Sequence, residues 1–164
     1  MEGHVVSVSR VIDAPAAALF AVVADAGRHP EIDGSGALVK LKDGSGLPQQ
    51  LSLGSTFGMK MKMGVPYTMS NTVIEFEPEK RIAWKTVLSG PLGRIIGGRI
   101  WRYEFEPVAD GTRVTESWDV SEDKQRLFLA TDKVAAATAD SMTKSLERLA
   151  DAVTASISPM PSTS

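Results

Sequence analysis

Glu116 has the most unusual chemical setting in the sequence, because it falls among side chains expected to form an apolar surface. Trp101, Tyr103 and Phe105 alternate with charged residues and therefore share one face of an expected strand. An Asp-Gly turn follows and favours a hairpin, whose returning strand places Glu116 and Trp118 on the same face. An apolar face with one carboxylate is more typical of a small-molecule pocket than of a filled core.

The chemistry open to Glu116 depends on what surrounds its carboxyl group. Burial raises the pKa of a carboxyl group unless a cation or a hydrogen-bond donor offsets it. Glu116 is then suited to contact a hydroxyl or amine of a ligand, or to act as a general acid and base near neutral pH. A purely structural role, in an internal ion pair or with a bridging water, stays open as well. Tyr67, Asn71 and Tyr103 are the best additional hydrogen-bonding candidates, and Glu116 is the one candidate for catalysis.

The other candidates are apolar or aromatic. Four methionines lie on two neighbouring expected strands, and methionine is flexible enough to line a pocket for varied apolar shapes, although ordinary core filling is the alternative. Inward-facing tryptophans carry N–H groups that need a polar partner, a water or a ligand when buried. The expected ligand-binding residues are Met59, Met61, Met63, Tyr67, Met69, Asn71, Trp84, Trp101, Tyr103, Phe105, Glu116, Trp118 and Met142.

Composition argues against several other kinds of site. The chain has no cysteine and two histidines, so thiolate chemistry is excluded and no metal or cofactor is expected. His29 precedes Pro30 in an expected turn, and we predict that it is exposed and has no catalytic role. The 18 Lys and Arg residues are scattered among 20 Asp and Glu, which leaves a net charge of −2 and no basic surface for nucleic acid.

A glycine-rich stretch runs from Gly90 to Gly98 between two expected strands. It lacks the Gly-Lys-Ser/Thr ending of a phosphate-binding loop. It also leads into a strand, rather than into a helix whose amino terminus would hold phosphate. Phosphate binding by this stretch is therefore rejected.

The elements that position these residues follow a simple order. A first strand over 4–12 is followed by two short helices before residue 34 and then by a run of antiparallel strands. A long helix over 130–157 carries one apolar stripe along its length. We therefore expect a single α+β domain over 1–157 and a mobile tail over 158–164.

The longest apolar run, 16–24, is shorter than the ~20 residues that a membrane-spanning helix needs. It follows an expected strand and not a basic amino terminus, so it is not expected to be a signal peptide. We therefore expect no integral membrane association and a cytoplasmic location.

The order of elements resembles the START-like helix-grip superfamily, also called SRPBCC, and within it the polyketide cyclase/dehydrase-like group. The matching residues are Val-Ile-Asp-Ala-Pro at 11–15, Trp-x-Tyr-x-Phe-x-Pro at 101–107, Gly-Thr-x-Val-Thr at 111–115 and a helical stripe of Met142, Leu146 and Leu149. The resemblance implies a curved seven-stranded antiparallel sheet wrapped around the long carboxy-terminal helix, with an apolar cavity between them. It also implies that the loop from Gly90 to Gly98 gates the mouth of that cavity.

Three hypotheses for function follow. In the first, the protein is a carrier or sensor that binds a hydrophobic small molecule such as a lipid, polyketide or aromatic metabolite. In the second, it is a polyketide cyclase, aromatase or dehydratase in which Glu116 moves protons. In the third, it is a protein-partner-binding module that presents its exposed sheet face, and Glu116 and the aromatic residues are then irrelevant to function.

Overall fold

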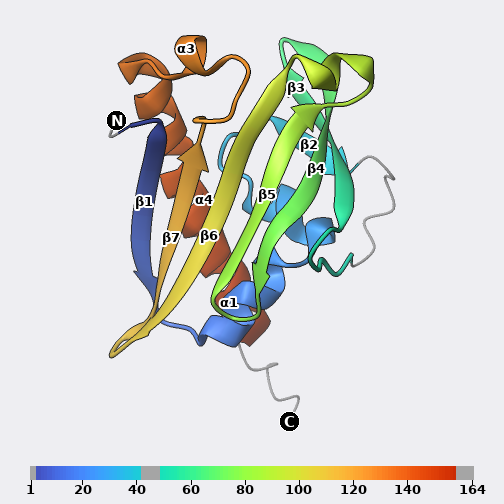
Figure 1. The fold of residues 1–164 in the computed structure, drawn as a ribbon. Coiled ribbons are helices and arrows are strands. Elements are labelled where there is room, and N and C mark those ends of the chain that lie inside the picture. The colour runs from blue at the N-terminus through green and yellow to red at the C-terminus, as the bar shows by residue number, and fades with distance from the viewer. Residues whose placement is uncertain (1–2, 42–48, 158–164) are drawn as a thin grey trace.

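The computed structural model describes residues 3–41 and 49–157, so the expected tail at 158–164 lies outside the described residues (Figure 1). The elements in chain order are β1 (Val5–Ile12), α1 (Ala16–Val23), the 3₁₀ turn η1 (Ala26–Arg28), α2 (His29–Ile32), β2 (Leu38–Leu41), β3 (Thr56–Met63), β4 (Val65–Glu77), β5 (Arg81–Leu88), the 3₁₀ turn η2 (Pro91–Arg94), β6 (Gly97–Val108), β7 (Gly111–Asp119), α3 (Arg126–Leu129) and α4 (Asp132–Ile157).

The strands form one antiparallel sheet in the order β1-β7-β6-β5-β4-β3-β2. Six of them span eight residues or more, whereas the edge strand β2 has four. Helix α4 runs behind this sheet in Figure 1 and contacts β1, β7, α1 and α2. The predicted α+β fold, with an open antiparallel sheet and a long carboxy-terminal helix, is confirmed.

The two strands of the aromatic hairpin share the expected apolar face. Tyr103 of β6 lies opposite Glu116 of β7, and Trp101 lies opposite Trp118. The alternation seen in the sequence therefore places the carboxyl group of Glu116 on the aromatic face of the sheet, which is the face that α4 covers.

Helix α4 is held on the sheet by its apolar stripe. Met142, Leu146, Leu149 and Val153 are spaced by four, three and four residues and are all buried. A helix presents such positions on one side, so the stripe buries most of the helix's large apolar side chains against the core.

A close contact brings the loop after α2 onto α4. A Cβ atom added to Gly34 would lie 2.1 Å from the backbone oxygen of Ser141, and the Gly34 amide donates a hydrogen bond of 2.9 Å to Ser145 Oγ. Because only glycine allows this approach, Gly34 sets the position of the neighbouring residue Asp33 over the interior of the sheet.

Candidate functional site

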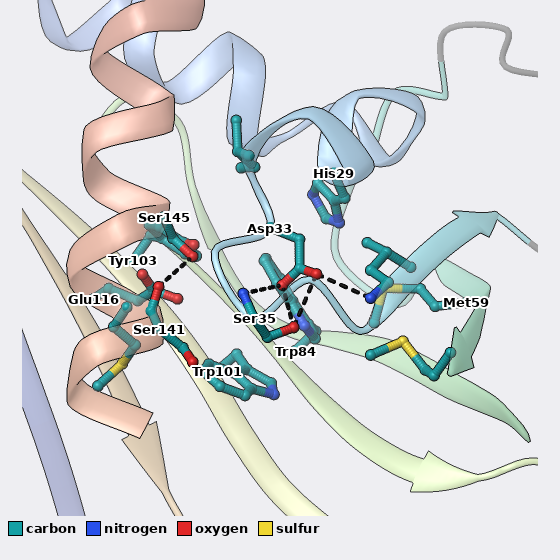
Figure 2. A pocket seen from close by; sticks show the side chains of 14 residues that line it. His29, Asp33, Ser35, Met59, Trp84, Trp101, Tyr103, Glu116, Ser141 and Ser145 are labelled. Atoms are coloured by element: carbon teal, nitrogen blue, oxygen red, sulfur yellow. Dashed lines mark hydrogen bonds between the residues drawn. The ribbon is translucent and has the colours of Figure 1, made fainter. Parts of the chain in front are cut away.

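An inner cavity of about 120 Å³ lies between the sheet, α4 and the loop after α2 (Figure 2). Glu116, Tyr103, Ser141 and Ser145 gather on its α4 side, while His29 and Asp33 lie on the side of the loop. The complete lining consists of His29, Ile32, Asp33, Ser35, Leu38, Met59, Met61, Trp84, Trp101, Tyr103, Glu116, Ser141, Met142 and Ser145.

Glu116 is buried in this cavity with its side chain incompletely bonded. The residue is 3 % exposed, and its Oε2 atom has no hydrogen-bond partner. Burial raises the pKa of Glu116 to about 8, the negative charge of Asp33 adds to the rise, and a hydrogen bond from Tyr103 opposes it. The carboxyl group is therefore protonated, and uncharged, at neutral pH.

Tyr103 is the partner of Glu116 on the adjacent strand. Burial raises the pKa of its phenol well above the usual value, and the nearby Glu116 raises that pKa further. Tyr103 therefore remains a neutral hydrogen-bond donor across the whole physiological range.

His29 is a correction to the sequence analysis, which expected it to be exposed. It is 4 % exposed, its Nε2 atom donates to the backbone oxygen of Val23 at 2.7 Å, and its ring stacks on Trp84 at 4.9 Å between centroids. Burial lowers the pKa of His29, so the imidazole is neutral near pH 7. The turn-like sequence around Pro30 concealed this position, because η1 and α2 fold the turn back over the sheet.

Trp84 contributes a second incompletely bonded group. Its Nε1–H is buried without an acceptor. Within the described residues, 3–41 and 49–157, the other buried side-chain nitrogen or oxygen atoms without a partner are Glu116 Oε2 and His4 Nδ1. Two of these three atoms thus belong to residues that line the inner cavity. Buried polar groups are normally paired, so a polar ligand atom or a water is expected between these walls.

Asp33 forms the end of the cavity opposite Glu116 and was missed by the sequence analysis. Its carboxylate accepts hydrogen bonds from Ser35 Oγ at 2.7 and 2.9 Å, from the Ser35 amide at 3.1 Å and from the Leu38 amide at 2.9 Å. Arg148 of α4 donates to the backbone oxygen of Asp33. Asp-x-Ser is a common turn pattern, so the sequence contained a signal for the loop but none for its place over the cavity.

A wider outer groove of about 970 Å³ adjoins the inner cavity. The residues that line both are Ser35, Met59, Met61, Trp101 and Ser141. The groove continues past Met63, Tyr67, Met69 and Trp118 to α3 and the first turns of α4. The two hollows are therefore contiguous, and the groove is the more open part.

Most of the residues expected to bind a ligand line one hollow or the other. The expected residues on the inner cavity are Met59, Met61, Trp84, Trp101, Tyr103, Glu116 and Met142. Those found on the outer groove alone are Met63, Tyr67, Met69 and Trp118. Tyr67 thus lines the outer groove and not the inner cavity that holds Glu116, and its contact with a ligand stays a prediction.

Asn71 and Phe105 line neither hollow, so their predicted contact with a ligand stays a prediction. Asn71 Nδ2 donates to the backbone oxygen of Phe57 at 3.2 Å, and Asn71 Oδ1 accepts from Thr86 Oγ1 at 2.6 Å, so the amide ties β4 to β3 and β5. The ring of Phe105 packs edge-on against Phe20 of α1 at 5.6 Å. Both residues are buried, but each packs against other side chains of the protein and not against the space of either hollow.

The loop from Gly90 to Gly98 is held at its second half by Gln125. The Gly97 amide donates to Gln125 Oε1 at 3.0 Å, and Gln125 Nε2 donates to the backbone oxygen of Ile95 at 2.6 Å. Ile96 lines the outer groove, whereas Leu92 and Ile95 are exposed. The predicted gate therefore remains a prediction for this loop.

Two kinds of feature are absent from the part of the chain that the structure describes. No group of three or more His, Asp or Glu side chains there is arranged to hold a metal ion. No described helix is long and apolar enough to cross a membrane.

This chain is similar in sequence to a known protein family and to a mycobacterial protein. Residues 3–154 match the profile of a family described as polyketide cyclase/dehydrase and lipid transport. The chain is 42% identical over 116 residues to an uncharacterised protein of Mycobacterium tuberculosis strain H37Rv, an alignment that covers 70% of this chain and 46% of the relative. The chain thus spans about half the length of this curated relative.

Solved structures show the same fold at low sequence identity. A Rhodobacter sphaeroides protein aligns with a TM-score of 0.68 and 16% identity over 94% of each chain. The AHSA1 protein of Silicibacter pomeroyi aligns with a TM-score of 0.66 and 19% identity over 93% of this chain and 99% of its own.

Proposed function

The chain belongs to the polyketide cyclase/dehydrase and lipid transport family, and we propose that it binds a hydrophobic small molecule, as a carrier or sensor, in the joined hollows between the sheet and α4. The observation that carries this proposal is the unpartnered Oε2 atom of Glu116, buried in the wall of an apolar cavity.

A site of this kind is costly to a protein that does not use it. Leaving a buried polar group unpaired costs about 1–3 kcal/mol, and a leucine in place of Glu116 would avoid that cost. The retention of an acid at the centre of the aromatic face therefore supports a ligand that pairs with it.

The capacity of the hollows fits the same proposal. Together they are comparable with ligand sites of roughly 300–1,000 Å³, and methionines 59, 61, 63 and 69 supply much of the apolar lining. Thioether side chains adapt to varied apolar shapes, which suits a carrier of hydrophobic metabolites.

Native mass spectrometry of the protein extracted from its own cells tests the proposal. We expect bound apolar material that is released on unfolding, and quenching of tryptophan fluorescence when a fatty acid or an aromatic ketone is added. A matched control is Ile74→Ser, which alters an apolar side chain exposed away from both hollows and should leave binding unchanged. Protein that carries no ligand and whose fluorescence is unchanged by every apolar compound would contradict the proposal.

A second candidate is catalysis of a cyclisation or dehydration, favoured by the pKa of about 8 at Glu116. A carboxyl group with this pKa exchanges a proton near neutral pH, and Tyr103 beside it is suited to orient a carbonyl group. Glu116→Gln separates the two candidates. Turnover lost with ligand affinity kept would favour the enzyme, whereas a wild-type protein that binds but converts no polyketide would favour the carrier.

A further inference from the structure

We propose that the ligand enters with an uncharged carbonyl group first, which the inner cavity binds, and that its hydrocarbon remainder lies in the outer groove. This inference rests on the proposed binding function and specifies the chemical class of the ligand. It is carried by the two unpartnered groups in the cavity wall and by the bonding of their neighbours.

Both unpartnered groups are hydrogen-bond donors. The indole Nε1–H of Trp84 has no lone pair to offer and donates only. Tyr103 donates to the carboxyl group of Glu116, and a protonated carboxyl still has one O–H to donate. Trp84 of β5 stacks on Tyr103 of β6 at 5.9 Å between ring centroids, and Tyr103 lies opposite Glu116 of β7, so the two donors flank Tyr103 on one face of the sheet. The ligand group that satisfies them is an acceptor, and a carbonyl oxygen has two lone pairs.

Several other polar groups of the lining already form hydrogen bonds within the protein. His29 Nε2 donates to Val23, and the two serines of α4 donate to backbone oxygens one turn earlier, Ser141 to Ala137 and Ser145 to Ser141. The oxygens of Asp33 accept the four hydrogen bonds of its loop. These groups therefore fix the walls and leave recognition to Glu116 and Trp84.

The charges around the cavity disfavour an ionised ligand head. No lysine or arginine is among the residues that line the inner cavity, whereas Asp33 is. A carboxylate head would lie near that negative charge without a counter-ion, at a large desolvation cost. An ammonium head would leave the N–H of Trp84 facing a cation.

The volume of the inner cavity limits how much of a ligand it can hold. A volume of about 120 Å³ corresponds to about four water molecules at ~30 Å³ each. Such a space admits a carbonyl group and the carbons next to it, so a longer chain must continue into the outer groove.

Calorimetry with four compounds of equal chain length tests the inference: methyl decyl ketone, laurate, dodecylamine and dodecane. We expect the ketone to bind about tenfold more tightly than each of the others near pH 7, the difference made by one well-placed hydrogen bond. Preference for laurate or dodecylamine, or equal affinity for ketone and dodecane, would overturn the inference and leave the proposed binding function standing. Failure of all four to bind would count against both.

Two variants localise the effect. Trp84→Phe keeps an aromatic ring but removes the donor. We expect this variant to bind the ketone about tenfold more weakly than the wild type and to bind dodecane with unchanged affinity. Trp118→Phe removes the same donor from the outer groove, where the hydrocarbon part lies, and we expect it to change the affinities for ketone and dodecane alike. Equal losses in both variants would overturn the inference. Above the pKa of about 8, ketone affinity of the wild type should fall while that of Glu116→Gln stays level.

A separate observation concerns the mouth of the outer groove. The β3–β4 turn, η2 and α3 lie at the same end of the molecule (Figure 1). Each exposes two large apolar side chains with a basic residue alongside. These residues, which we call the apolar rim, are Met63 and Val65 with Lys62, Leu92 and Ile95 with Arg94, and Leu127 and Phe128 with Arg126. Six of the ten most exposed large apolar side chains among the described residues thus belong to the rim.

We infer that the apolar rim docks on an anionic lipid surface. Exposed apolar side chains insert into the interface between headgroups and acyl chains, and the adjacent cations pair with anionic headgroups. The pattern repeats on three segments that are far apart in the sequence, and Met63, Leu127 and Phe128 also line the outer groove. Docking there would let an apolar ligand pass between membrane and groove without crossing water.

Sedimentation with lipid vesicles tests this second inference. We expect binding to vesicles of phosphatidylcholine mixed with phosphatidylserine, little binding to phosphatidylcholine alone, and weaker binding as salt is raised. Leu127→Ser combined with Phe128→Ser should reduce binding several-fold, and Val11→Ser combined with Ile74→Ser, exposed elsewhere, should not. Absence of vesicle binding, equal loss in both double variants, or capture of a protein partner by the rim in place of vesicles would overturn it.

Discussion

The inner cavity and the outer groove share part of their walls but differ in how they are made. The inner cavity is small, its lining is held by hydrogen bonds to backbone atoms, and its two unpartnered groups are buried. The outer groove is about 970 Å³, is lined mainly by apolar side chains and ends among exposed ones. The difference suggests that the cavity selects the ligand whereas the groove supplies room and access. Changes to the cavity should therefore disturb the fold, and changes to the rim should not.

The largest expected difference between the two regions is the pH dependence of the unfolding free energy that Glu116 causes. Its pKa is about 8 in the folded protein, against a usual value of 4.5, so the unfolded chain releases this proton first as pH rises. The stability contributed by the protonated group is complete below about pH 4.5 and is lost as pH rises through about 8, a change on the order of 4 kcal/mol.

Urea unfolding of wild type and Glu116→Gln across this range measures the effect. The variant should gain stability over the wild type as pH rises, while His29, whose lowered pKa weakens the fold as pH falls below about 6.5, contributes equally to both proteins. If the unfolding free energies of the two proteins changed with pH in parallel, Glu116 would ionise as freely as an exposed acid. The cavity would then be as open to water as the groove.

The next effect is expected at Gly34, which allows the loop to approach α4. Gly34→Ala places a Cβ 2.1 Å from the backbone oxygen of Ser141, and we expect a loss of about 3 kcal/mol of unfolding free energy. Gly36→Ala is the matched control in the same loop. Its added Cβ meets open space at φ +70°, so only the backbone strain of about 1 kcal/mol is expected. Equal losses in chemical denaturation would show that close packing on α4 does not matter.

A smaller loss is expected for Asn71→Leu, which tests a residue between the strands and outside both hollows. Removing the amide leaves Thr86 Oγ1 and the backbone oxygen of Phe57 unpaired, at a cost of about 2 kcal/mol. Thermal unfolding measures this loss, and ligand affinity should stay at the wild-type value. A variant that folds normally but binds the ligand poorly would show that Asn71 takes part in ligand binding.

The smallest effect is expected at the apolar rim. Met63 is 70% exposed, so Met63→Ser should change the unfolding free energy by less than about 0.5 kcal/mol. Urea denaturation compared with Met69→Ser, whose side chain is buried in the groove wall, makes the contrast. A large loss at Met63 would mean that the rim packs as part of the core.

The fold, and the cavity wall that carries Glu116, could be predicted from the alternation of apolar and polar residues along the strands. Alternation fixes which face of a strand a side chain occupies, so the shared face of Tyr103 and Glu116 was predictable. Their direct pairing was not, because the turn falls at Ala109 and Asp110, between the paired residues Val108 and Gly111. Alternation does not tell how far along the sheet a residue lies from the cavity. For this reason it did not distinguish Asn71 and Phe105, which line neither hollow, from the residues that line the cavity.

The opposite wall could not be predicted in the same way. His29 and Asp33 reach the cavity because two short helices and a loop fold over the sheet and rest on α4. Their positions depend on contacts between segments more than 100 residues apart, such as that of Gly34 with Ser145. No periodic pattern in the sequence records a contact of that kind.

Helix α4 supplies walls to both hollows from successive turns, since Val134 and Thr138 face the groove, Met142 and Ser145 face the cavity, and Ser141 borders both. A displacement of α4 along its axis would therefore change both spaces together. Because α3 directly precedes α4 in the chain and lies at the surface, it would be displaced with the helix.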